Sequence, residues 1–125
     1  MGLDLTLIPI RYHKIEWWLA TDTLSTQRDG LGHLINDGVH AKTLKTHPIP
    51  SKKDFRFYDD DGLKKRTTDP YGGKLRYVKA GKLAEFFEDI GEENPNVTEF
   101  SEWNQGIMDF VKRIPSETPI VLWWH

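Results

Sequence analysis

The hydrophobic residues of this chain form strand-like patterns at both of its ends. Leucines alternate with polar residues across 3–10, and a period of two is typical of a strand with one buried face. Pro9 should end this strand or place it at a sheet edge. The run 119–124 is almost continuously apolar, which is typical of a strand covered on both faces, although an exposed docking patch is the alternative. We predict that the two strands pair, because chain termini often lie close together.

Further strands are predicted in the middle of the chain. Residues 15–24 are rich in aromatic and β-branched side chains, and we predict a strand antiparallel to the first, with a helix as the alternative. Residues 54–58 and 63–67 are predicted to form a hairpin, because Asp61-Gly62 is a favoured hairpin dipeptide. Residues 74–80 also alternate, but the pattern does not decide which face is buried.

Amphipathic helices are predicted mainly in the C-terminal part. Apolar residues recur at spacings of three and four within 81–90, which Gly91 should end, and within 99–114. Thr98 is the expected N-cap of the second of these helices. Residues 30–38 should form one or two further helical turns, with a glycine at the C-terminal end.

These elements predict a single-domain α+β protein spanning residues 1–125. We expect a mixed or antiparallel sheet of four to six strands, with the N- and C-terminal strands both in the sheet. The helices at 81–90 and 99–114 should pack on one face of it. At 125 residues the chain is long enough to bury one core without disulfides.

The composition excludes several classes of protein. With 38% hydrophobic and 29% charged residues, the chain does not have the composition of a disordered protein. It has no Cys, which excludes thiolate metal sites and a Cys nucleophile and suits the cytoplasm. The first residues lack the regions of a signal peptide, and no stretch approaches the roughly 18 apolar residues of a membrane span. We therefore expect a cytoplasmic protein that does not enter a membrane.

The charge is unevenly distributed along the chain. Residues 42–82 carry 12 Lys and Arg against 5 Asp and Glu, whereas residues 83–125 carry 2 against 9. Such a chain can fold its basic part onto its acidic part or present two charged faces to different partners, and solvated faces without a special role are the third interpretation. The candidate binding residues are Lys64, Lys65, Arg66, Tyr71 (in a turn at 69–73) and Arg76 on the basic side, and Glu88, Asp89, Glu92 and Glu93 on the acidic side.

The leading functional hypothesis is a non-enzymatic binding protein with a protein partner. Nucleic acid is the alternative partner, because the cations of residues 52–79 interleave with Phe55, Phe57, Tyr58, Tyr71 and Tyr77. Cations that bind phosphates beside rings that stack on bases are typical of single-strand binders. The simpler alternative is a solvated hairpin whose rings face the core. The oligomeric state of the protein is left open.

A small metal-dependent hydrolase or nuclease is the second functional alternative, with Asp22, Asp29, His33 and His40 as candidate catalytic residues. The carboxylates flank an expected strand-to-helix junction, where nucleases place metal ligands, but capping and ion pairing are the simpler interpretation. No two His residues have the helical spacing of a zinc site. The sequence "DDDG" (59–62) lacks the EF-hand spacing, and no Gly-rich phosphate loop is present. We expect no cofactor and no bound metal.

Three segments, "DTLSTQRD" (22–29), "DPYGGKLRYVKAGKL" (69–83) and "WNQGIMDFVKRIPSETPIVLWWH" (103–125), resemble small uncharacterised proteins of phages and prophages. The resemblance brings no assigned activity and no catalytic residues. It implies a phage-encoded accessory protein, and many such proteins bind and block a host component.

Overall fold

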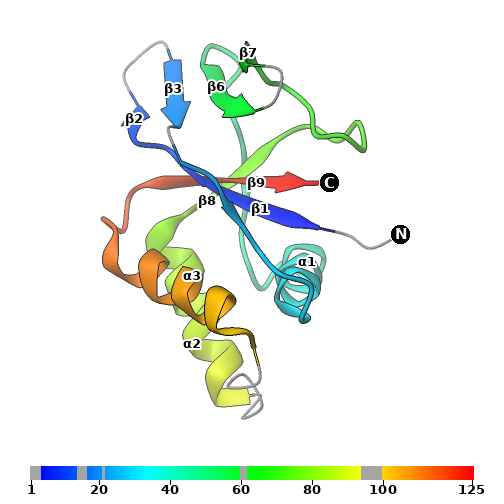
Figure 1. Ribbon diagram of the computed structural model, residues 1–125, viewed down its shortest axis with the longest axis vertical. Helices are drawn as coiled ribbons and strands as arrows, with labels where there is room; N and C mark the ends of the chain where they lie inside the picture. The colour runs from blue at the N-terminus through cyan, green and yellow to red at the C-terminus, as the bar shows by residue number, and fades with distance from the viewer. Residues whose placement is uncertain (1–3, 14–16, 21, 60–61, 94–99) are drawn as a thin grey trace.

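The computed structural model describes residues 4–13, 17–20, 22–59, 62–93 and 100–125. Within these ranges the chain forms an α+β fold in three layers (Figure 1). A five-stranded sheet lies in the middle, a four-stranded sheet lies above it in Figure 1, and three helices lie below it. The expected fold class is therefore confirmed, and the structure adds a second sheet.

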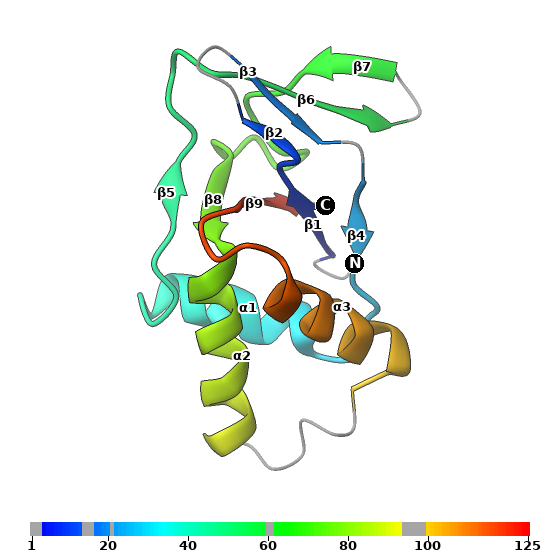
Figure 2. The same cartoon turned by 90° about the vertical axis from the view of Figure 1, so that its left-hand side faces the viewer.

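The five-stranded sheet contains both terminal strands in its interior. Its order is β4 (Leu24–Ser25), β1 (Leu5–Pro9), β9 (Pro119–Trp124), β8 (Arg76–Lys79) and β5 (His47–Pro48), and all neighbours are antiparallel. Figure 2 shows β5 and β4 at the two edges. The predicted pairing of the two terminal strands is confirmed, with a register that runs from Leu5 opposite Trp124 to Pro9 opposite Ile120.

The apolar run of β9 is explained by cover on both faces of the central sheet. Ile120 and Leu122 belong to the core between this sheet and the helices. Val121 belongs to a second core between the two sheets. The prediction that the first strand has a single buried face is wrong, because Ile8 and Ile10 are also buried, under the second sheet.

The second sheet contains the four remaining strands of the described residues. Its order is β2 (Tyr12–His13), β3 (Trp17–Ala20), β6 (Asp54–Asp59) and β7 (Gly62–Lys65). The hairpin of β6 and β7 is confirmed: Asp59 lies opposite Gly62, whose φ of 89° favours glycine. The single strand predicted at 15–24 is wrong, because β3 pairs parallel with β6 and only β4 pairs with β1.

All three helices contribute to the core beneath the central sheet. They are α1 (Leu31–His40), α2 (Ala80–Glu93) and α3 (Glu102–Arg113). The predicted helix ends need correction. Gly38 does not end α1 but lies inside it, where a Cβ would be 2.6 Å from Phe86 Cζ. Gly91 does not end α2, which continues to Glu93.

The N-cap of α3 also differs from the prediction. Thr98 lies outside the described residues, and the cap is Ser101, whose Oγ accepts a hydrogen bond from the Asn104 N–H. None of the helices in the described ranges has the length and apolar character that crossing a bilayer requires.

Candidate functional site

A basic groove lies where the edges of the two sheets approach each other. It has a volume of about 540 Å³. Four cationic residues line it: Lys53, Lys65, Arg66 and Lys74. Its apolar lining includes the partly buried Ile49 and the buried Leu75. We call this site the basic groove; the described residues that line it include no Asp or Glu.

Three separate chain segments form the basic groove, and backbone hydrogen bonds connect them. They are residues 48–53, which lead from β5 into β6, residues 65–68, which leave β7, and residues 74–75, which lead into β8. The Ile49 N–H donates to the Leu75 carbonyl, and the Leu75 N–H donates to the Thr67 carbonyl. The site is therefore built on the sheets rather than on a free loop.

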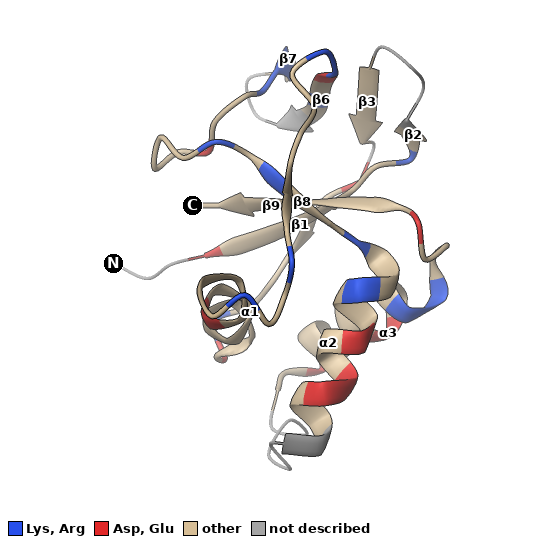
Figure 3. Cartoon of the chain, turned by 180° about the vertical axis from the view of Figure 1, so that it is seen from behind, with Lys and Arg blue, Asp and Glu red and all other residues tan. Residues whose placement is uncertain are grey.

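The cations of the basic groove differ in exposure. Lys65 and Lys74 are exposed, whereas Lys53 and Arg66 are half-buried. The Arg66 guanidinium lies 5.3 Å from the centre of the Phe57 ring, a cation–π contact that orients it. Figure 3 shows the Lys and Arg segments gathered around β6, β7 and β8, with Asp and Glu segments on α2 and α3. The helices that carry these acidic residues also carry Lys82, Lys112 and Arg113, so the two charge signs overlap there.

The predicted basic residues have different roles in the structure. Lys65 and Arg66 line the groove and Lys64 is exposed beside them on β7. Tyr71 is 56% exposed at the tip of a turn, in which the Asp69 carboxylate accepts hydrogen bonds from the Tyr71 and Gly73 N–H groups. This confirms the predicted turn.

Arg76 is engaged within the protein. Its guanidinium donates to the hydroxyl and carbonyl oxygens of Thr46, at 2.7 and 2.9 Å. It therefore fastens the segment before β5 to β8. The groove also includes Lys53 and Lys74, which were expected among the cations of residues 52–79 but not among the candidate binding residues.

The predicted acidic residues lie on α2, in the helical layer. Glu88 and Asp89 are exposed there. The side chains of Glu92 and Glu93 lie outside the described part of the structure. The described acidic pair does not line the basic groove.

The aromatic residues of the basic strands face the interior. Phe55 and Phe57 are only 1% and 4% exposed. Tyr77 is half-buried, with its ring 5.0 Å from that of Trp18 and 5.5 Å from that of His47. The side chain of Tyr58 lies outside the described residues. Of the candidate rings of the basic strands that the structure describes, only that of Tyr71 is exposed.

Asp29 is a structural cap that joins two helix starts. Its carboxylate accepts hydrogen bonds from the N–H groups of Leu31 and Ser101 and from the Asn104 side-chain amide. Burial opposes ionisation of Asp29, but the bonds from Ser101, Leu31 and Asn104 outweigh this effect and lower its pKa. The simpler interpretation, capping, therefore holds for Asp29.

The four candidate catalytic residues do not converge. Asp22 lines a different cavity, described below. His33 and His40 are both exposed on α1, seven residues and hence about 10 Å apart along the helix. Among the described residues, no three His, Asp or Glu side chains are placed to hold one metal ion. Within the described part of the chain, the four candidates therefore do not assemble the metal site that a hydrolase or nuclease would require.

Comparisons with models of protein families, with curated proteins and with solved structures give no match to this chain. The functional conclusion therefore depends on the geometry of the basic groove.

Proposed function

We propose that the protein is a non-enzymatic binding protein whose basic groove takes an acidic segment of a protein partner. The observation that carries this proposal is the groove itself, in which four cations from three chain segments surround an apolar lining. A role as a phage-type accessory protein or inhibitor of a host macromolecule is consistent with this and is what the sequence resemblance implies. Action in the cytoplasm is expected from the absence of Cys.

The lining of the basic groove favours a peptide over a nucleic acid. Ile49, Leu75 and the neighbouring prolines, Pro48 and Pro50, offer an apolar surface for aliphatic side chains. Single-strand binders instead expose rings on which bases stack, and Phe55 and Phe57 are buried. Carboxylates of the partner would meet the cations at the rim while its apolar residues contact the lining. Complementary charges of this kind mainly determine specificity and the rate of association.

The size of the basic groove indicates that it anchors a larger contact. A volume of about 540 Å³ matches the pocket for one small ligand, about 300–1,000 Å³. A stable protein interface buries about 800 Å² on each partner. Lys64 and Tyr71, both exposed next to the lining segments, would extend the contact beyond the groove.

Fluorescence anisotropy with labelled short peptides tests this proposal. The peptides alternate Glu or Asp with Leu or Ile, and matched peptides carry Gln and Asn in place of the acids. We expect the acidic peptides to bind, with an affinity that falls as salt is added. Oligo-dT and oligo-U of similar length are the competitors. If the oligonucleotides bind and the acidic peptides do not, the partner is a nucleic acid and the proposal is wrong.

Charge-neutral variants locate the binding. The double variant Lys65→Gln/Lys74→Gln removes two exposed cations from the groove. The control Lys82→Gln/Lys112→Gln removes two exposed cations from α2 and α3, so its net charge is the same. We expect about tenfold weaker peptide binding for the groove variant and little change for the control. Equal loss in both would show attraction by net charge alone and would contradict a defined site.

A further inference from the structure

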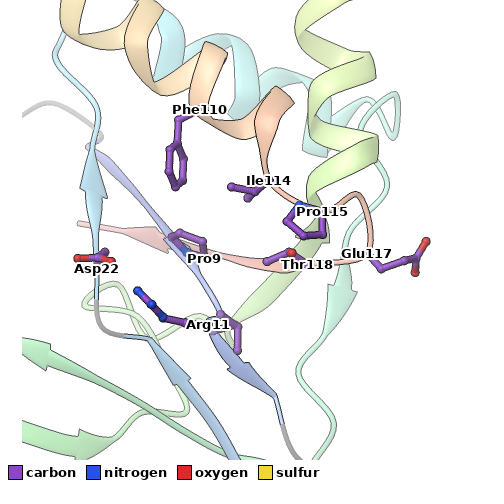
Figure 4. Close-up of a pocket in the computed structure, with 9 residues that line it drawn as sticks. Pro9, Arg11, Asp22, Phe110, Ile114, Pro115, Glu117 and Thr118 are labelled. Carbon is purple, nitrogen blue, oxygen red and sulfur yellow. The ribbon is translucent and has the colours of Figure 1, made fainter.

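A second cavity, which we call the α3 cavity, lies between the C-terminal end of α3 and the end of β1 (Figure 4). Its volume is about 470 Å³, within the range of pockets that hold small molecules. Pro9 and Ile10 come from β1 and the residue that follows it, and Phe110 and Ile114 come from the end of α3. The described residues that line this cavity are all different from those that line the basic groove.

Phe110 is the main apolar wall of the α3 cavity. The residues that α3 buries in the core include Ile107, Met108 and Val111, whereas Phe110 is 42% exposed. Figure 4 shows its ring pointing from the helix into the space above Pro9. Covering such a ring is favourable by about 25 cal/mol for each Å² removed from water. An apolar group of a ligand placed against Phe110 would gain this free energy.

Two opposite charges stand at one end of the α3 cavity. Figure 4 shows the Arg11 and Asp22 side chains directed toward each other on the side facing Phe110 and Pro9. Glu117, a further charged residue among the described lining, forms an ion pair with Lys79 at 2.8 Å. Arg11 also lies 5.9 Å from the Tyr12 ring, a cation–π contact that helps to position it. The polar lining of the cavity therefore includes both a guanidinium and a carboxylate.

We propose that the α3 cavity binds a small zwitterion with an apolar side chain, of the α-amino acid type. The carboxylate of the ligand would accept hydrogen bonds from the Arg11 guanidinium, and its ammonium group would donate to the Asp22 carboxylate. The apolar side chain would lie against Phe110, Pro9 and Ile114. A simple anion would meet repulsion from Asp22, and a simple cation would meet repulsion from Arg11. Only a ligand that carries both charges complements both residues.

Titration of the full-length protein with matched probes, followed by NMR chemical shifts, tests this proposal. L-Phenylalanine carries both charges, N-acetyl-L-phenylalanine lacks the ammonium group, and L-phenylalaninamide lacks the carboxylate. We expect L-phenylalanine to shift the Phe110, Ile114 and Ile10 resonances. The two blocked probes should bind at least about tenfold more weakly. Equal binding of either blocked probe would overturn the proposal, and so would the absence of shifts at these residues. Glycine, which has both charges but no side chain, should bind much more weakly than L-phenylalanine.

Variants assign the two charged contacts. Arg11→Gln and Asp22→Asn should each weaken L-phenylalanine binding about tenfold, because each removes one charge-assisted interaction. The controls Lys112→Gln and Asp109→Asn make the same charge changes at exposed positions of α3 outside the cavity and should bind like the native protein. Unchanged binding in Asp22→Asn would overturn the assignment of the ammonium contact. The comparison of probes on the native protein decides the question even if a variant does not fold.

Discussion

Replacement of Asn104 by Ala is the most direct test of how the helical layer is joined to the sheet. Asn104 is 0% exposed. Its amide oxygen accepts from the Gln27 N–H at 2.8 Å, and its amide nitrogen donates to the Gln27 carbonyl at 2.9 Å and to Asp29 at 2.6 Å. One side chain on α3 thus provides hydrogen-bond partners for Gln27 and Asp29, in the segment between β4 and α1. The substitution to Ala removes all three bonds.

The expected loss follows from the groups left behind. A buried polar group without a partner costs about 1–3 kcal/mol. Gln27 is an exposed residue, so water can reach part of its backbone. The lower end of that range therefore applies to its N–H group and to its carbonyl group. Weakening of the Asp29 cap adds to this. We expect Asn104→Ala to lower the free energy of unfolding by about 2–4 kcal/mol. For a domain of this size, each kcal/mol lowers the melting temperature by about 3–6 °C.

Urea unfolding followed by circular dichroism measures this loss. The control is Asp109→Ala, an exposed position on the same helix, which should stay within about 0.5 kcal/mol of the native protein. Asp29→Ala and the double variant complete a thermodynamic cycle, in which we expect a coupling of about 0.5–3 kcal/mol. A loss below about 1 kcal/mol for Asn104→Ala, or purely additive effects in the cycle, would refute the view that this junction holds the helices in place.

Four further substitutions are expected to change stability in stated directions. Gly81→Ala should destabilise the protein by about 1–3 kcal/mol, because the added Cβ would be 2.8 Å from Ser116 Cβ and 3.3 Å from the Ser116 carbonyl oxygen. Gly106→Ala should stabilise it by about 0.5–1 kcal/mol in the same urea assay, because the added Cβ would meet no neighbouring atom within 4 Å. The lowered pKa of Asp29 means that its ionised form contributes stability above the ordinary value of 3.8, and that this contribution is lost as pH falls through the folded value. The difference in unfolding free energy between the native protein and Asp29→Asn should therefore shrink in acid, and a constant difference would contradict it. Leu122→Ala should cost about 2–5 kcal/mol in the melting assay, since Leu122 is 2% exposed in the core between the central sheet and the helices, and a smaller loss would argue against its burial beneath the helices.

The terminal strands could be predicted because their signals are local. The alternation in 3–10 and the apolar run in 119–124 each indicate a strand without knowledge of its neighbours. The second sheet could not be predicted in the same way. Its β3 and β6 pair in parallel across more than thirty residues of chain, and nothing in the continuous pattern of 15–24 marks where the chain leaves one sheet for the other.

The sequence predicted the basic groove in part and the α3 cavity not at all, because both combine distant segments of the chain. The excess of positive charge in 42–82 indicated a basic surface, but not that Lys53 and Lys74 share a groove with Lys65, because three segments and two sheets bring them together. The α3 cavity combines residues 9–11 with Asp22 and residues 110–118. None of these residues is unusual in its own sequence context, so only the packed structure reveals the cavity.

The structure separates the residues that hold the fold from those proposed to bind. The exposed Lys65 and Lys74 of the basic groove belong to neither of the two cores, which consist of apolar side chains between the layers. The Asp29–Asn104 junction, in contrast, is remote from the groove lining and joins α3 to the chain before α1. Substitution of Lys65 and Lys74 should therefore change binding at nearly constant stability, because exposed Lys residues contribute little to folding. Substitution of Asn104 should do the reverse, changing stability while the intrinsic affinity of the folded protein is kept. This opposite behaviour of the two sets of variants is what a binding surface carried by a rigid double-sheet core requires.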